Sequence, residues 1–198
     1  MSRSRIGEVL NASTTEFVAA CDDLHRPPPF GALVSASDGE RDVLGLVYHA
    51  STGSADPGRP AIVRGRGMES EEDVYHQHPQ LAMLLQTEIK ALVVGFDEDG
   101  VVRQHLPPRP AAIHAFLYRA SDDLMQRFYQ RLDFLSILIG TPVAAPVDEL
   151  IAAGLRAARS SVGPAQEREL TIRAGRQLVV LMNGDPARLG AVLRRLRA

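Results

Sequence analysis

Residues 42–49 read DVLGLVYH and are apolar at both the odd and the even positions. A run of this kind, which lacks a polar face, is typical of a strand that is covered on both sides. A second apolar run, ALVVGFD at 91–97, is followed by Glu98-Asp99-Gly100 and by a short run at 101–105. Because Asp-Gly between two apolar runs signals a tight turn, residues 91–105 are predicted to form a β-hairpin.

Shorter strands are predicted on either side of these runs from period-2 alternation and from β-branched residues. They cover residues 6–10, 16–21, 32–35 and 113–118, the last of them as an edge strand. Residues 51–67 are rich in Gly, Pro and Ser, which predicts a long connection. Residues 69–86 predict a helix with an acidic start, broken in two by Pro79.

From Ser121 onwards the apolar period changes from 2 to 3.6, which predicts helices. Ser121 is expected to cap one helix that ends at Gly140. Three further helices are predicted over 146–160, 164–182 and 186–196, with Asp185 as the N-cap of the last. The chain is thus β-rich first and helical second, an α+β arrangement.

Composition excludes several classes of protein. The chain has 198 residues, and its apolar runs are far shorter than the ~20 residues that a membrane-spanning helix needs. The first residues carry charge without an apolar segment behind them, so no secretory signal is expected and the predicted location is cytoplasmic. The single cysteine, Cys21, fits a reducing compartment and is expected to be a small core residue.

The basic residues are almost all Arg, since the 22 Lys and Arg include one Lys, Lys90. No Gly stands near Lys90, so the chain has no P-loop, whose lysine follows a glycine-rich turn. Residues 1–149 carry a net charge of −8 and residues 150–198 carry +6, which together give −2. This asymmetry indicates a basic partner surface in the C-terminal part. Its candidate residues, expected to be free for solvent or a partner, are Arg156, Arg159, Arg188, Arg194, Arg195 and Arg197.

A metal site is conceivable where His76 and His78 stand beside Glu72 and Asp73, because imidazoles and carboxylates are zinc ligands. Two residues apart on a helix, however, two side chains point about 200° away from each other and do not share an ion. An ordinary polar loop is the preferred interpretation, and no metal or cofactor is expected.

Two further features are candidate functional sites. His105 and His114 flank the proline-rich residues 107–110 and could act as an acid or a base, but nothing pairs them with a nucleophile. Arg64-Gly65-Arg66-Gly67 could contact phosphate or could be an ordinary loop. The chain is therefore not expected to be an enzyme.

Five short motifs follow one another in a fixed order. They are IGEV at 6–9, STTEF at 13–17, GALV at 31–34, VLGLV at 43–47 and ALVVG at 91–95. This series resembles the HAS barrel, the small β-barrel shared by HerA-type DNA translocases and the catalytic-ring subunits of rotary ATP synthases. The resemblance covers residues 5–118. It implies a closed barrel of about six strands, in which Gly7, Gly31 and Gly45 sit at crowded bends.

This resemblance adds domain boundaries to the expected α+β fold. Residues 1–118 form a HAS-like β-barrel with a helical insertion around 69–88, and residues 119–198 form an α-helical C-terminal module. In the family the barrel is usually joined to a RecA-like ATPase core. About 80 residues of helix are too few for such a core, so the resemblance implies a stand-alone barrel with a binding role.

The expected function is a non-enzymatic binding and assembly module that docks on a ring-forming, translocase-type ATPase or assembles with itself. In the second case the acidic and basic parts of the chain could meet head to tail. The alternative is a nucleic-acid-associated accessory protein that uses the Arg-rich C-terminal helices. Aromatic residues make up 5% of the chain and Trp is absent, which argues against base stacking. A third hypothesis, a hydrolase dependent on a metal or on His76 and His78, lacks a recognisable catalytic constellation.

Overall fold

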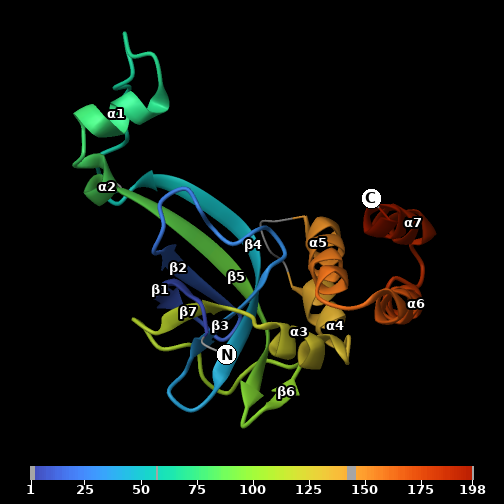
Figure 1. Ribbon diagram of the computed structural model, residues 1–198. Helices are drawn as coiled ribbons and strands as arrows, with labels where there is room; N and C mark the ends of the chain where they lie inside the picture. Colours follow the sequence, from blue (N-terminus) through green and yellow to red (C-terminus); the bar gives the residue numbers. More distant parts are fainter. Residues whose placement is uncertain (1–2, 57, 142–145, 198) are drawn as a thin grey trace.

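The fold is α+β, as the sequence predicts (Figure 1). It is seen in a computed structural model that describes residues 3–56, 58–141 and 146–197. The strands are β1 (Arg5–Ala12), β2 (Glu16–Cys21), β3 (Leu33–Ser37), β4 (Asp42–Ser54), β5 (Leu85–Glu98), β6 (Val101–Arg103) and β7 (Phe116–Arg119). The helices are α1 (Glu71–Gln77), α2 (Leu81–Leu84), α3 (Asp122–Tyr129), α4 (Phe134–Gly140), α5 (Val147–Ser160), α6 (Pro164–Leu181) and α7 (Pro186–Arg197).

The strands form one antiparallel sheet that closes on itself. Its order is β2-β1-β7-β3-β4-β5-β6, and β2 pairs on its other side with β5. In that closing pair Phe17 lies opposite Ala91 and Ala20 opposite Glu88. Strand β6 lies outside the closed part and pairs with β5 through the predicted hairpin. We call the ring of β1, β2, β3, β4, β5 and β7 the closed sheet.

The inside of the closed sheet is filled by small and β-branched side chains around one ring, that of Phe17. Gly45 makes room for this ring, because a Cβ atom at Gly45 would lie 2.8 Å from Cε1 of Phe17 and 2.9 Å from Cβ of Ala91. Gly7 and Gly31 are also crowded by neighbouring backbone, and Gly31 has a positive φ of 83°. The main interior residues are Val9, Phe17, Ala19, Val34, Ala36, Val43, Val47, Ile89, Ala91, Val93 and Leu117.

A second core lies between one outer wall of the closed sheet and the C-terminal helices. Leu44, Leu46 and Tyr48 of β4 alternate with the interior residues and belong to one apolar core with residues of α3, α4 and α5, of which α5 contacts β4. The prediction that residues 42–49 are covered on both sides is therefore confirmed. The wall formed by β1, β2 and β7 faces away from the helices (Figure 1).

Strands β4 and β5 continue well beyond the closed sheet as a two-stranded ribbon. The pairing runs on to Ser54 opposite Leu85, so residues 51–54 belong to a strand and not to the connection predicted over 51–67. The ribbon carries residues 55–84, here called the excursion, which contain α1 and α2 and project from the rest of the molecule (Figure 1). Pro79 lies between the two helices, at the predicted break.

Two expectations about the second half are wrong. Strand β7 is not an edge strand, since it pairs with β1 on one side and β3 on the other. The helix expected from Ser121 to Gly140 is divided into α3 and α4. At the division, Nε2 of Gln104 donates to the carbonyl oxygens of Phe128 (2.6 Å) and Arg131 (3.1 Å), and Oε1 accepts from the N–H of Phe134 (3.1 Å).

Several local predictions are confirmed. The hydroxyl of Ser121 accepts a hydrogen bond from the N–H of Leu124, so Ser121 caps α3. Asp185 caps α7 through the N–H of Arg188. Helices α5 and α6 begin and end within a residue of the predicted ranges. In the described residues, no helix combines the length and the apolar character that a membrane crossing requires.

Candidate protein-binding surfaces

Four of the six arginines proposed as partner-binding residues are bound within the chain. The guanidinium of Arg188 pairs with Asp148 at 2.8 Å, and that of Arg195 pairs with Glu149, so α7 is fastened to the start of α5. Arg156 donates to the carbonyl oxygen of Arg195 at 2.6 Å. Arg159 donates to the carbonyl oxygen of Leu196 and pairs with Glu167. These arginines hold the helical module together, a role that the sequence analysis did not foresee.

The remaining two members of the set are Arg194 and Arg197. Arg194 is exposed on α7, and it forms no ion pair with any residue that the structure describes. The side chain of Arg197 lies outside the described residues. The partner-binding role of the set stays a prediction, and three of its six positive charges are already paired with Asp148, Glu149 and Glu167.

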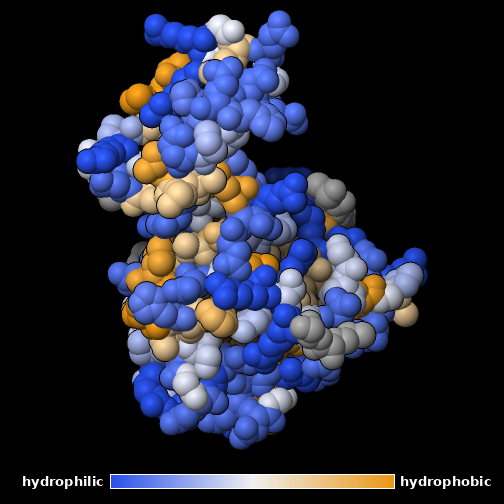
Figure 2. Space-filling view, turned by 60° about the vertical axis from the view of Figure 1, so that its left-hand side comes forward, coloured by the Kyte–Doolittle hydropathy of each residue, from blue (hydrophilic) through white to orange (hydrophobic). Residues whose placement is uncertain are grey.

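One exposed apolar surface lies on the excursion. Met83, Val63, Ile62 and Leu84 are 85%, 78%, 67% and 47% exposed. A groove of about 600 Å³ lies between the end of the ribbon and α1, and its lining includes the apolar residues Ile62, Val74, Leu81, Met83 and Leu84 and the charged residues Asp56, Arg59 and Arg64. Figure 2 shows apolar residues at this end of the molecule among polar ones. We call Ile62, Val63, Met83, Leu84 and the groove the tip surface.

Local sequence explains why the excursion has a defined shape. Ser70 and Asp73 form a capping box: the Ser70 hydroxyl accepts from the N–H of Asp73, and the Asp73 carboxylate accepts from the N–H of Ser70. Nε2 of His25 lies 2.6 Å from the hydroxyl of Tyr75, which links α1 to the loop after β2. The N–H of His25 in turn donates to the hydroxyl of Thr87, on the ribbon, at 2.8 Å.

A second exposed apolar surface lies on α6. This helix buries Leu170, Ala174 and Leu178, which are spaced four residues apart. On the opposite side, Ile172, Val179 and Val180 are 56%, 53% and 70% exposed. Exposed arginines flank these three residues. We call Arg168, Ile172, Arg176, Val179 and Val180 the α6 surface.

A third exposed apolar surface lies on the wall of the closed sheet that the C-terminal helices do not cover. Leu10 of β1, Phe116 of β7 and Ile113 just before β7 are each between two fifths and a little over half exposed. The guanidinium of Arg5 lies 3.9 Å from the centre of the Phe116 ring. We call Leu10, Ile113 and Phe116 the bare wall.

The histidines considered as metal-binding or catalytic residues do not form one cluster. His76 is in the last turn of α1 and His78 caps its end, while His105 contacts the ring of Phe96 and His114 pairs with Glu8 at 2.6 Å. Within residues 3–56, 58–141 and 146–197, no three His, Cys, Asp or Glu side chains are grouped as metal ligands would be. Burial raises the pKa of the Cys21 thiol to about 11, with smaller contributions from Asp22 and Asp23.

Comparison with known proteins adds no family to these observations. The chain matches none of the protein-family models against which it was scanned, and a search of curated proteins finds no match.

Proposed function

We propose that this chain is a non-enzymatic binding and assembly module, a HAS-type barrel that docks on a ring-forming ATPase of the translocase type. The observation that carries the proposal is the closure of the sheet through the pairing of β2 with both β1 and β5. Six strands thereby enclose a small apolar core, as in a small β-barrel. Gly7 and Gly45 occupy crowded positions in the closed sheet, which supports the resemblance to the HAS barrel, whereas Gly31 is crowded by Ala153 and Gly154 of α5.

The distribution of the helices supports docking through the barrel. The helical module covers the wall of β3, β4 and β5, and it leaves β1 and β7 in contact with solvent. The bare wall adds exposed Leu10, Ile113 and Phe116 to that side. Apolar residues grouped on an otherwise polar surface are characteristic of protein–protein contacts. We assign the ATPase to the bare wall.

The chain itself offers no place for ATP hydrolysis of the P-loop kind. Lys90 lies within β5, paired with Val18 of β2 and His49 of β4, and not in a glycine-rich turn before a helix. In this proposal the partner hydrolyses ATP and this chain supplies a docking surface. The nucleic-acid alternative gains no support, because Arg156, Arg159, Arg188 and Arg195 already have partners in the chain.

The proposal is tested by purifying the tagged full-length chain from its own host under mild conditions and identifying what accompanies it. We expect a ring-forming ATPase in near-stoichiometric amount, and its loss from the variant Leu10→Glu/Phe116→Glu. Both side chains are already partly solvated, so this variant is expected to fold. A matched control, Met83→Glu on the tip surface, is expected to retain the ATPase. Recovery of the wild-type chain without an ATPase overturns the proposal.

A further inference from the structure

The groove of the tip surface carries one positive charge that the described part of the chain does not neutralise. Of its three charged lining residues, Asp56 accepts a hydrogen bond from the N–H of Gly58 at 2.9 Å and pairs with Arg59 at 3.7 Å. Arg64 is partly buried, and no carboxylate of the described residues lies within ion-pair distance of its guanidinium. Because a partly desolvated cation is stabilised by an anionic partner, the groove suits an occupant that brings a carboxylate.

The loop before α1 holds Arg64 in the groove and leaves Arg66 outside it. A Cβ atom at Gly65 would lie 3.3 Å from Cγ2 of Val74, so the backbone between the two arginines lies against α1. Arg64 lines the groove, whereas Arg66 is exposed and is not one of the lining residues. The two arginines of the Arg-Gly-Arg-Gly stretch therefore differ in their surroundings, although they stand two residues apart.

The rest of the groove is largely apolar and is open on one side. Ile62, Met83 and Leu84 line it and are 67%, 85% and 47% exposed. A small molecule in its binding site usually has about 70–90% of its surface buried, which is more than such an open groove provides. A polypeptide, in contrast, covers both the groove and exposed Val63 beside it. Grouped exposed apolar residues with a flexible methionine among them are typical of surfaces that bind protein segments.

The other charges of the excursion restrict the partner further. Glu69, Glu71 and Glu72 are exposed near the start of α1 and do not line the groove. These carboxylates would repel a strongly acidic segment. A phosphate group, which carries about −1.5 to −2 charges at neutral pH, exceeds the single charge of Arg64. A segment with several apolar residues and one carboxylate therefore matches the groove best.

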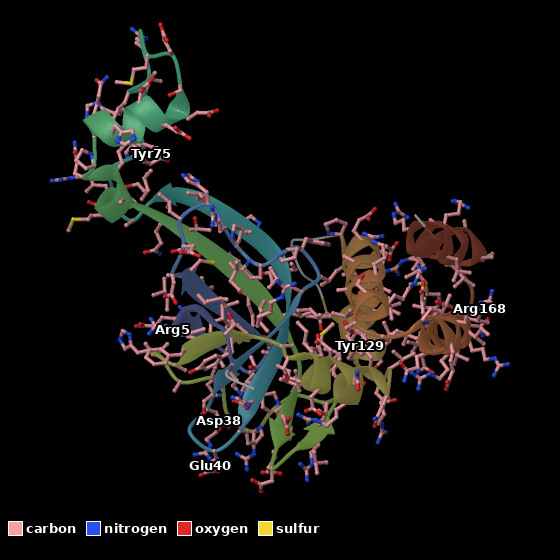
Figure 3. The ribbon with its side chains drawn as sticks, in the orientation of Figure 1. Arg5, Asp38, Glu40, Tyr75, Tyr129 and Arg168 are labelled. Carbon is pink, nitrogen blue, oxygen red and sulfur yellow. The ribbon has the colours of Figure 1, made fainter. Side chains whose placement is uncertain are left out.

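We infer that the tip groove binds a short apolar segment of another protein, and that a single carboxylate of this segment pairs with Arg64. The site lies on the excursion, at the opposite end of the molecule from α6, where Figure 3 shows Tyr75 of α1. It shares no residue with the bare wall. The inference therefore goes beyond the proposed docking on an ATPase and adds a second kind of partner.

The test begins with a library of short random peptides displayed on phage, selected on the immobilised full-length chain. Phage that also bind the variant Met83→Glu are removed, because a carboxylate at this position repels the expected ligand and makes the groove polar. We expect the enriched peptides to share apolar residues and one Asp or Glu. A selection that yields no peptide specific for the wild-type groove overturns the inference, and so do enriched peptides without a carboxylate.

A charge cycle then gives the decisive result. The best peptide and its amide version, with Gln or Asn in place of the acidic residue, are titrated by fluorescence anisotropy. Arg64→Met keeps a long side chain without its charge, and we expect it to raise the Kd of the acidic peptide about tenfold or more. The amide peptide should bind the wild-type chain equally weakly, and Arg64→Met should weaken it little further. The matched control Arg66→Met should leave the Kd within about twofold of wild type.

Misfolding does not obscure these measurements. Arg64 forms no ion pair with the described residues and Met83 is 85% exposed, so the variants are expected to keep the wild-type circular dichroism spectrum and midpoint of thermal unfolding. Arg64→Lys, which keeps a positive charge, should bind the acidic peptide more tightly than Arg64→Met does. An unchanged Kd for Arg64→Met overturns the inference, and so does an equal loss for Arg66→Met. Because ATPase recovery is measured separately and depends on the bare wall, either proposal fails independently of the other.

Discussion

The side-chain oxygen of Gln104 accepts a 3.1 Å hydrogen bond from the backbone N–H of Phe134, at the point where one predicted helix becomes two. The amide nitrogen of the same side chain donates to the carbonyl oxygens of Phe128 and Arg131. One glutamine from the segment after β6 therefore replaces the helical hydrogen bonds that the break removes. On either side of this junction α3 and α4 both contact α5, and α4 also contacts β5.

Removing this glutamine should destabilise the junction. Gln104→Ala removes partly buried hydrogen bonds to the Phe128 carbonyl and the Phe134 N–H, and an exposed one to the Arg131 carbonyl. We therefore expect the free energy of unfolding to fall by about 1–3 kcal/mol. Gln104→Glu keeps an acceptor but places a carboxylate against two carbonyl oxygens, and its effect should be at least as large. Urea unfolding measures both. The control Gln77→Ala, at an exposed position at the end of α1, should change stability by less than about 0.5 kcal/mol. An equally small change for Gln104→Ala would contradict the role given to this residue.

The fit of Gly45 against Phe17 predicts a strong difference between two glycines of the same strand. Gly45→Ala adds a Cβ atom 2.8 Å from the Phe17 ring, and we expect it to lower the free energy of unfolding by about 1–3 kcal/mol. Gly53→Ala, eight residues further along β4, meets open space and should be neutral or slightly stabilising. Thermal unfolding of the two variants checks this. Equal midpoints would show that the interior of the closed sheet can accommodate the extra carbon.

Asp38 makes the stability of the β3–β4 turn depend on pH. Burial raises the pKa of this carboxyl, but hydrogen bonds from the N–H groups of Glu40 (2.9 Å) and Arg41 (2.7 Å) and from the Arg41 guanidinium outweigh burial and lower it. A lowered pKa in the folded state means that the ionised form stabilises the fold. This contribution is complete above the unfolded-state pKa of about 4 and is lost as the pH falls through the lower folded-state pKa.

The expected result is a smaller loss of stability in acid for Asp38→Asn than for the wild-type chain. Urea unfolding at a series of pH values between neutrality and acid, with both proteins in the same buffers, isolates this carboxyl from the others. Parallel curves for the two proteins would mean that Asp38 has the same pKa in the folded and unfolded states.

The thiol of Cys21 is expected to react slowly. With a pKa of about 11, the thiolate fraction at pH 8 is about a hundredfold below that of a thiol with the ordinary value, and the side chain is only partly accessible. Alkylation by iodoacetamide at this pH should therefore be slow in the native chain and fast in urea. Fast native alkylation would place Cys21 in a more polar environment than the end of β2 provides.

The attachment of α7 to α5 can be measured through Arg188 and Asp148. Both side chains are about a third exposed, so a double-mutant cycle with Arg188→Ala and Asp148→Ala should give a coupling of about 0.5–1 kcal/mol that decreases with salt. Arg194→Ala, on the same helix, serves as the control and should leave stability unchanged. A coupling near zero would assign the attachment of α7 to its apolar residues, Val192 and Leu196 among them.

The sequence was sufficient to predict those elements whose signal lies in neighbouring residues. The alternation of Phe17, Ala19 and Cys21 located β2 to the residue, and Ser121 marked the start of α3. The ribbon was missed because residues 51–54 read STGS and contain no apolar residue whose spacing could indicate a strand. Their pairing with β5 rests on backbone hydrogen bonds and on a bond between the hydroxyls of Thr52 and Thr87. The place of β7 between β1 and β3 was missed because strand neighbours far apart in the chain leave no periodic signal.

The same difference between neighbouring and distant residues explains which parts of the candidate surfaces could be predicted. The charge asymmetry of the sequence led to the prediction of a basic partner surface, but it gave no information on which guanidinium groups pair with carboxylates in the fold. Asp148 and Glu149 stand forty or more residues before Arg188 and Arg195, so only the fold brings these four side chains together. The tip surface was not predicted, because Ile62, Val63 and Met83 lie in a stretch whose glycines and prolines indicate a loop.

The pairing of Ser54 with Leu85 places the two ends of the excursion side by side, at a distance that a hairpin turn spans. The thirty residues between them can therefore be regarded as an interchangeable module. A short Asn-Gly turn in their place would leave every strand of the closed sheet and the whole helical part intact. Evolution, or an engineer, can thus change what this end of the molecule contacts by exchanging one continuous segment of the gene.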